Sequence, residues 1–301
     1  MEKGKEKIIV YLGGGAMSGV YGAGVLKGLH DLSLVNSIEA IYTGSVGSIN
    51  AAYLLSNQTE IGPTIYFEDL QNGFIFPLNI FTGTFDLIMN RFIKRIQSEK
   101  AHNVVDINYV YNILKNKKPL DLCAIKDSPI ALYIKILNID TGEIKYESFK
   151  DCPNLDLLKA SISIKPYYFD ETLIGKNHYV DGTIKEPLGI EYLLSKYPNR
   201  KILVVLNEPT KRGLRHYFKN FIEASVSSLY PYKISLFKIF IVRENFLRKD
   251  IRICLNNKNI LLPHPNFKHR VRPRTTNPSI LKRNFNHGME DSQNVLSFIN
   301  K

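Results

Sequence analysis

The stretch Ile41-Tyr42-Thr43-Gly44-Ser45-Val46-Gly47 decides the fold class, because it sets a serine between two different kinds of element. Residues 39–43 are short and apolar, as expected of a buried strand, and residues 46–57 are rich in Ala and Leu, as expected of a helix. A sharp strand-to-helix turn of this kind exposes the serine hydroxyl above a parallel sheet. Such an elbow needs small neighbours, and the candidates that support it here are Gly44, Val46 and Gly47. Taken alone, Ser45 is also explained as the N-cap of the following helix.

A glycine-rich loop precedes this elbow. Residues 7–12 form a short apolar run that predicts a strand, and residues 18–32 have apolar positions near helical spacing. Glycines at such a junction let backbone N–H groups turn toward a phosphate or a developing oxyanion. The glycines concerned are Gly13, Gly14 and Gly15. A plain tight turn is the alternative interpretation.

A third signal is Tyr179-Val180-Asp181-Gly182, at the end of a predicted strand. A nucleophilic serine needs a base to take its proton, and no histidine stands in a convincing motif. Asp181 is therefore the candidate base, with Gly182 as its small neighbour. A turn with a satisfied carboxylate explains an Asp-Gly pair equally well.

The rest of the chain continues the alternation of strands and helices. Residues 60–125 favour helices, 129–140 and 143–149 a hairpin, 155–164 and 189–196 helices, and 201–207 a buried strand. A final helix is expected over residues 291–298. This order predicts a three-layer α/β/α fold with a mainly parallel central sheet.

Charge is distributed unevenly along the 301 residues. Residues 211–301 hold 18 Lys and Arg against 5 Asp and Glu, so the net charge of +12 comes from this part. We therefore expect a core over 1–210 and a basic, aromatic-rich part over 211–301 on the same domain. The basic residues of 211–274 favour an anionic membrane surface as partner. A solvated face without a partner is the alternative interpretation.

Few features point to metals, disulfides or membrane spans. Three scattered cysteines, Cys123, Cys152 and Cys254, do not form a disulfide framework and fit a reducing compartment. No Cys/His cluster suggests a metal site, and no cofactor is expected. The longest apolar runs are too short for a signal-peptide core or a membrane span. We expect a cytoplasmic protein that contacts membranes peripherally.

Together, the glycine loop, the serine elbow and the late Tyr-Val-Asp-Gly resemble the patatin-like phospholipase family, in the order found there. The resemblance extends to residues 105–107, 119–121 and 140–143, to the small-residue helix and proline turn at 160–166, and to 260–263 and 288–291. Two positions differ from the family: Thr43 stands where a glycine is usual, and Ser18 where Arg or Lys is common. Neither replaces a residue that does the chemistry.

The resemblance implies a lipid acyl hydrolase with a Ser–Asp dyad. Ser45 would attack the ester carbonyl, Asp181 would accept its proton and later activate water, and Gly13, Gly14 and Gly15 would supply the oxyanion hole. The substrate implied is a phospholipid or another acyl-ester lipid. A second hypothesis is a catalytically weak or silent patatin-fold protein that binds anionic lipid. A nucleic-acid partner is disfavoured, because it would leave the serine elbow and Asp181 unexplained.

Overall fold

The central element of the protein is an eight-stranded sheet. A computed structural model describes residues 7–93, 103–151, 153–230 and 232–300. The strands follow the order β5-β6-β3-β2-β1-β7-β8, and β4 pairs with β3 outside this path. The strands are β1 (Ile8–Leu12), β2 (Ile38–Thr43), β3 (Ala131–Asn138), β4 (Ile144–Ser148), β5 (Thr172–Ile174), β6 (Asn177–Asp181), β7 (Lys201–Val205) and β8 (Ile260–Leu261).

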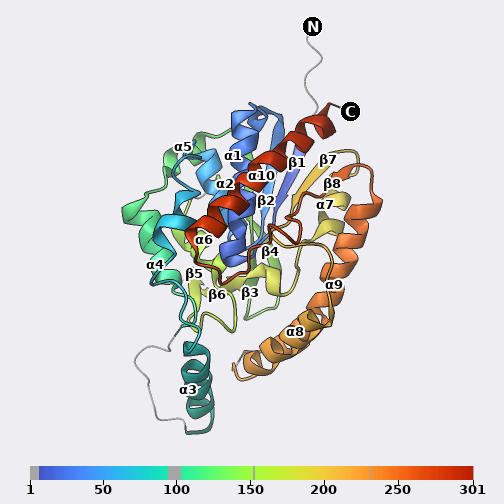
Figure 1. Ribbon diagram of the computed structural model, residues 1–301. Helices are drawn as coiled ribbons and strands as arrows, with labels where there is room; N and C mark the ends of the chain where they lie inside the picture. The colour runs from blue at the N-terminus through green and yellow to red at the C-terminus, as the bar shows by residue number, and fades with distance from the viewer. Residues whose placement is uncertain (1–6, 94–102, 152, 231, 301) are drawn as a thin grey trace.

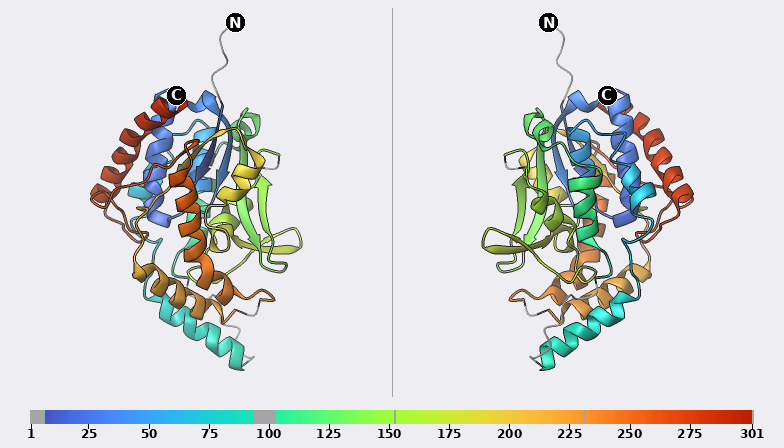
Figure 2. Two further views of the ribbon diagram at one scale, coloured as in Figure 1. Left: turned by 90° about the vertical axis from the view of Figure 1, so that its right-hand side faces the viewer. Right: turned by 90° about the vertical axis from the view of Figure 1, so that its left-hand side faces the viewer.

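Five neighbouring strands, β3, β2, β1, β7 and β8, run parallel, and the antiparallel pairings are confined to β4, β5 and β6. Helices cover both faces of this sheet (Figures 1 and 2). They are α1 (Val20–Asp31), α2 (Gly47–Leu55), α3 (Asn79–Ile93), α4 (Ile107–Asn112), α5 (Leu122–Asp127), α6 (Leu155–Ile162), α7 (Ile190–Lys196), α8 (Leu214–Ser227), α9 (Leu236–Asn256) and α10 (Pro278–Ile299).

The central strand β1 shows how the sheet is buried on both faces. Ile8, Val10 and Leu12 belong to one apolar cluster, which includes side chains of α1, α2 and α10. Ile9 and Tyr11 belong to a second cluster, which includes side chains of α7 and α9. Alternate residues of a strand point to opposite faces, so a strand buried on both faces is apolar throughout. The predicted α/β/α fold with a mainly parallel sheet is confirmed.

Most predicted elements are present, but the short strands β5 and β8 and the full extent of the last helix were not predicted. The strand β5 was not expected, because its three residues carry too little pattern; it pairs with β6 as a hairpin. The last helix begins at Pro278 rather than at residue 291. Asn277 caps it through bonds from the N–H groups of Ser279 and Ile280, a start signal that the sequence analysis missed.

Close contact with α1 explains why α10 contains a glycine. The two helices pack along each other in Figure 1. A Cβ on Gly288 of α10 would lie 2.2 Å from the carbonyl oxygen of Tyr21, and a Cβ on Gly24 of α1 would lie 2.1 Å from that of Phe285. Such distances leave no room for a side chain, so the helices approach backbone to backbone.

The sequence around residues 233–249 predicts a basic amphipathic helix for a membrane interface, because Phe237, Phe240, Ile241 and Leu247 fall near one helical face. This helix corresponds to α9, but these apolar residues do not share one environment. Phe240 is fully buried in a third apolar cluster, whereas Phe237 and Ile241 are each 37% exposed. The expectation that Phe240 faces a membrane together with Phe237, Ile241 and Leu247 is therefore wrong for Phe240. Phe240 instead anchors α9 to the core.

Some expectations fall outside what the structure describes. The described residues do not include 94–102, which belong to the predicted helical stretch 60–125, and they do not include Cys152. Of the other cysteines, Cys123 is exposed and Cys254 is buried, and both are free. Across the described ranges, every helix is too short or too polar to traverse a lipid bilayer.

The α1–α10 contact gives a first prediction, which concerns stability. We expect Gly24→Ala to lower the free energy of unfolding by about 1–3 kcal/mol, because the added methyl group overlaps the Phe285 carbonyl. This loss opposes the gain of about 1 kcal/mol in helix propensity that alanine normally brings. Denaturant unfolding measures the difference. Gly213→Ala is the reference for replacing a glycine without a clash, because a Cβ at Gly213 meets nothing within 4 Å. Gly213 is the N-cap of α8, so a loss of up to about 1 kcal/mol is expected there from the cap alone. Equal or higher stability of Gly24→Ala would contradict the packing described here.

Candidate active site

Ser45 occupies a strained turn between β2 and α2. Its φ of 54° lies in the left-handed region, which residues other than glycine seldom adopt. The backbone N–H and the hydroxyl of Ser48 both donate to the Ser45 carbonyl, at 2.9 and 2.8 Å. The Ser48 hydroxyl also lies 2.6 Å from that of Ser161 in α6. The buried hydroxyl groups of Ser48 and Ser161 therefore stabilise the elbow through the Ser45 carbonyl.

The interpretation of Ser45 as a helix cap is not supported. The N-cap of α2 is Val46, and no side chain makes a capping bond there. The Ser45 side chain is thus not engaged by the helix that follows it, while its residue remains 8% exposed.

The small neighbours predicted for the elbow are explained by contacts. A Cβ on Gly14 would lie 2.7 Å from Ser45 Cβ and 3.3 Å from its Oγ, so the glycine loop lies directly against the serine side chain. A Cβ on Gly44 would lie 2.4 Å from Thr183 Cγ2. Comparable close contacts, all under 3 Å, would arise for Gly47 against Leu12, Gly182 against Lys135, and Gly19 against Val46.

The strand β3 brings Asp181 to this elbow. Tyr133 and Ile134 pair with β2 and β4 at once, and Ile136 and Leu137 pair with β4 and β6 at once. Therefore β4 pairs with one edge of β3, while β2 and β6 both pair with its other edge, β2 along the first part of β3 and β6 along the last part. Thr43, the last residue of β2, pairs with Ile134, and Asp181, the last residue of β6, pairs with Ile136. The two strand ends meet there.

Asp181 is completely buried and its two carboxylate oxygens differ. The Oδ1 atom accepts hydrogen bonds from the backbone N–H and the hydroxyl of Thr183, at 2.8 and 2.7 Å. The Oδ2 atom is buried and has no hydrogen-bond partner among the described residues. Burial raises the pKa of Asp181, and the interactions with Ser45, Thr183 and Arg243 oppose that rise. The alternative of a turn with a fully satisfied carboxylate therefore fails at Oδ2.

Ser45 and Asp181 are neighbours without an ideal hydrogen bond between them. The Ser45 hydroxyl is close enough to lower the pKa of Asp181 as a hydrogen-bonding group. The geometry of an ordinary hydrogen bond is nevertheless not met, since Oδ2 has no partner by distance and angle. Such contacts commonly tighten when substrate binds.

The glycine loop offers fewer free donors than the sequence predicts. The Gly13 N–H already donates to the Val205 carbonyl at 3.0 Å, as part of the contact between β1 and β7. The prediction that Gly13 is an oxyanion donor is therefore corrected, because its N–H is already used to join β1 to the end of β7. Within the described chain, the N–H groups of Gly14, Gly15 and Val46 donate to no other group.

Asn207, two residues after β7, was missed by the sequence analysis. Its side-chain N–H groups donate to the carbonyls of Gly13 and Gly14 at 2.7 and 3.0 Å, and its Oδ1 accepts from the Gly22 N–H at 2.9 Å. Fixing these carbonyls fixes the orientation of the peptide planes that follow them. A lone Asn after a strand carries no distinctive pattern, so no sequence signal identifies it.

The two positions that differ from the family are accommodated. Ser18 is buried, and its hydroxyl donates to the Gly15 carbonyl at 2.7 Å, so it closes the loop on itself. The Thr43 hydroxyl donates to the Tyr133 carbonyl at 3.2 Å. Neither side chain leaves a polar group unsatisfied.

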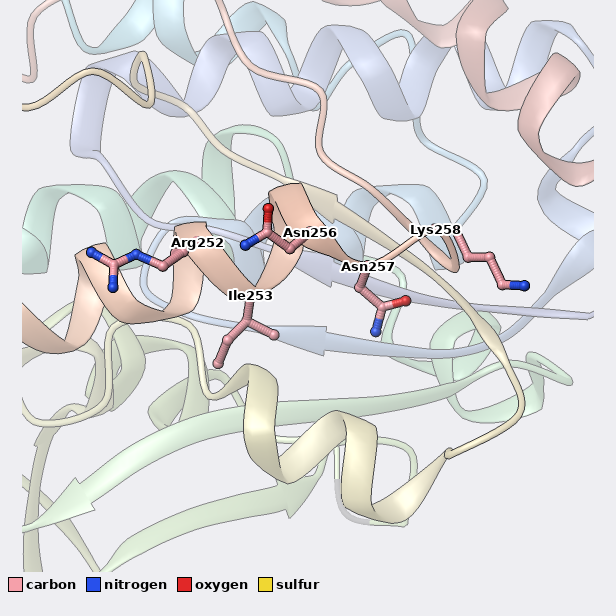
Figure 3. Close-up of a pocket in the computed structure, with 5 residues that line it drawn as sticks. All are labelled: Arg252, Ile253, Asn256, Asn257 and Lys258. Carbon is pink, nitrogen blue, oxygen red and sulfur yellow. The ribbon is translucent and has the colours of Figure 1, made fainter.

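Other candidate groups lie elsewhere. No histidine in the described part of the chain hydrogen-bonds to Ser45 or Asp181; His178 interacts instead with Asp140. Among the residues that the structure describes, no group of three or more His, Cys, Asp and Glu side chains is arranged to hold a metal ion. An open hollow at the end of α9 (Figure 3) is lined by Arg252, Ile253, Asn256, Asn257 and Lys258. It contains neither the elbow nor the glycine loop.

The parallel sheet with its elbow, glycine loop and buried aspartate defines an α/β protein of the patatin fold. Residues 10–194 match the family model described as patatin-like phospholipase. The match covers more than half of the chain, and the chain belongs to the patatin-like phospholipase family. Membership implies lipid acyl hydrolase activity.

Comparison with individual proteins adds little to this. A solved structure titled VipD from Legionella pneumophila is similar over 97% of this chain and 67% of its own length, with 12% sequence identity and a TM-score of 0.45. No curated protein sequence matches the chain significantly.

Burial of Asp181 gives a prediction for pH dependence. A carboxyl whose pKa is raised on folding lowers stability as pH rises from its unfolded value of about 3.9 through the raised value. Asp181→Asn removes this ionisation and keeps an acceptor for Thr183. We therefore expect the variant to match wild type at low pH and to be more stable at neutral pH. Denaturant unfolding at several pH values tests this, and lower stability at neutral pH would contradict it.

Asn207 gives a second prediction for the site. In Asn207→Asp a carboxylate oxygen would face the Gly13 and Gly14 carbonyls, because the amide N–H donors are lost. We expect a loss of about 2–4 kcal/mol in unfolding free energy at neutral pH. The loss should shrink at acid pH, where the protonated carboxyl again donates one hydrogen bond. A deficit that is independent of pH would contradict this account.

Proposed function

We propose that the protein hydrolyses acyl esters of lipids through a Ser45–Asp181 dyad and an acyl-enzyme intermediate. The observation that carries the proposal is the unpartnered Oδ2 of a buried carboxylate beside a serine held at a strained elbow. Ser45 Oγ attacks the ester carbonyl as Asp181 takes its proton. Asp181 then gives this proton to the departing alkoxide, so that the alcohol leaves and the carboxylate is regenerated. The carboxylate next takes a proton from the water that attacks the acyl-enzyme, and it returns that proton to Ser45 as the fatty acid is released.

The surroundings of Asp181 suit it to act as a base. Thr183 occupies Oδ1 with two donors, so proton transfer is directed to Oδ2. Burial raises the pKa of the carboxyl, which increases its basicity toward neutral pH. Without a positively charged histidine to stabilise, the carboxylate itself accepts the proton.

The developing oxyanion needs backbone donors near Ser45. Gly14 supports this role because it lies against the serine side chain and its N–H donates to no other described group. The N–H groups of Gly15 and Val46 are the further candidates, the latter following the nucleophile directly. The N-terminus of α2 adds a favourable dipole. Asn207 orients the loop by fixing the carbonyls of Gly13 and Gly14.

A phospholipid or a related acyl-ester lipid is the substrate class that family membership supports. The basic residues of 211–274 support peripheral contact with anionic membranes, because that segment carries 15 Lys and Arg against 3 Asp and Glu. A silent lipid-binding protein is the competing outcome. It predicts vesicle binding without release of fatty acid.

Loss of the nucleophile gives the direct test. We expect Ser45→Ala to reduce fatty-acid release from mixed phospholipid vesicles by about a thousandfold or more. Ser33→Ala is the matched control, because Ser33 also has a positive φ of 55° but is remote from the site. Circular dichroism checks that each variant is folded. Equal release by wild type and Ser45→Ala, or no release by either, would refute the proposal.

The pH profile tests the base. Because the pKa of Asp181 is raised by burial, we expect activity to rise with pH, with a midpoint above the ordinary aspartate value of about 3.9. Initial rates with a soluble short-chain ester measure this without interference from vesicles. A rate that is constant across the acid range would contradict the assignment of Asp181.

A further inference from the structure

Helix α8 is amphipathic in the reverse of the usual sense. Its inward side is mainly polar, with His216, Asn220, Glu223 and Ser227 buried. Its outward side is apolar: Leu214 is 85% exposed, Phe218 67%, Phe221 52% and Ile222 48%. A helix that serves only to cover a core turns its apolar side inward. Exposed apolar clusters of this kind mark interaction sites.

Helix α3 and the turn before it present a second set of exposed apolar residues. Leu78 is 77% exposed, Phe81 74%, Phe85 60% and Ile88 38%. Their spacing places them on one side of the helix. The opposite side carries Ile80 and Leu87, which pack against the third apolar cluster.

The two helices lie at the same end of the molecule. Ala224 of α8 belongs to the apolar cluster on which Ile80 and Leu87 of α3 pack. Both views of Figure 2 show α3 and α8 side by side. In Figure 1 the chain enters β1 at the opposite end, so the carboxyl ends of the parallel strands point toward α3 and α8. Ser45 lies at this end of the sheet.

Positive charge accompanies the apolar residues. Lys211, Arg215 and Lys219 are exposed at or beside α8, with Lys219 also 3.4 Å from Glu223. Glu223 is the one acidic residue of α8, and it is buried and accepts a hydrogen bond from Tyr167 at 2.6 Å. The exposed side of α8 therefore combines aromatic side chains with cations and carries no carboxylate.

A loop far along the chain extends this basic region. Burial lowers the pKa of Arg270, the charges of Arg215, Arg272 and Arg212 lower it further, and the charge of Glu208 opposes them. Arg270 is therefore close enough to other guanidinium groups to be repelled by them, with Glu208 as an acidic neighbour that offsets part of the repulsion. An anionic surface would relieve this repulsion.

We propose that the outward sides of α3 and α8 form a docking surface for an anionic phospholipid bilayer. The apolar side chains enter the boundary between head groups and acyl chains, and the cations contact lipid phosphates. A second copy of the chain fits less well, because it would bring the same cations face to face. The proposal deepens the proposed function, since it rests on a lipid substrate reaching Ser45 from this end.

Contacts connect this surface to the candidate active site. The Oε2 atom of Glu223 in α8 lies 3.8 Å from the guanidinium nitrogen Nη1 of Arg243 in α9. Arg243 in turn donates to the Thr183 carbonyl at 3.1 Å, and Thr183 holds Asp181. The buried side of α8 is therefore connected, through Glu223 and Arg243, to Thr183, the residue that orients the candidate base.

Single tryptophans test the surface sharply, because the natural chain has none. Phe218→Trp reports on α8, Phe85→Trp on α3, and Leu255→Trp is the control, since Leu255 is 63% exposed at the far end of α9. Each change is made in the Ser45→Ala protein, so lipid is not consumed. The probe is vesicles of phosphatidylcholine with phosphatidylserine, with brominated lipids as quenchers.

We expect the tryptophans at 218 and 85 to shift to shorter emission wavelength and to be quenched by brominated lipid, and the tryptophan at 255 to do neither. Absence of a change at 218 and 85, or equal changes at all three positions, would overturn the proposal. A shift at 218 and 85 that follows protein concentration without vesicles would assign the surface to a second copy and would also overturn it.

Two variants quantify the contributions. Phe218→Ser with Phe221→Ser should weaken partitioning to these vesicles by about a hundredfold, and Leu255→Ser should leave it unchanged. All three substitutions, made in wild-type protein, should retain hydrolysis of a soluble short-chain ester. Unchanged partitioning would overturn the docking surface. If the wild-type protein does not hydrolyse the ester, the proposed function fails. The docking surface is still tested, because partitioning to vesicles is measured separately.

Discussion

The arrangement along one side of β3 is the constraint on which the site depends. Because β2 ends at the level of Ile134 and β6 ends at the level of Ile136, a parallel and an antiparallel strand meet end to end. The elbow after β2 and the aspartate at the end of β6 therefore lie beside each other, although Ser45 and Asp181 are 136 positions apart in the sequence. Backbone pairing, rather than any direct Ser45–Asp181 bond, sets their separation.

The local features of this site could be predicted from the sequence, because each has a steric cause that leaves a pattern. Gly14 and Gly47 are glycines since any side chain there would meet Ser45 or the Leu12 backbone at less than 3 Å. The alternation of strands and helices likewise followed from apolar spacing. What could not be predicted depends on distant pairing: Gly13 loses its N–H to Val205, and Asn207 reaches back to the glycine loop.

The side of a helix that faces the core is a second feature that could not be predicted from the sequence. The periodicity of α8 and α9 indicates amphipathic helices but does not say which side faces the core. In α9 the core receives Phe240, whereas in α8 it receives Glu223 and other polar residues. The buried Glu223 is stabilised by Tyr167, Lys219 and Arg243, which come from α8 and from distant segments. A polar inner side is possible in α8 because these partners exist, and their arrangement appears only in three dimensions.

Three unusual features of the protein place unfavourable groups where a fold alone does not need them. An unpartnered carboxylate oxygen at Asp181 and a positive φ at Ser45 each reduce stability, and exposed aromatic residues on α8 reduce solubility. All three lie toward one end of the sheet, where the parallel strands finish. Such concentration of locally unfavourable features is expected where binding or chemistry, rather than stability, determines the residues. The stability that supports them comes from the two-sided sheet and from the close α1–α10 contact.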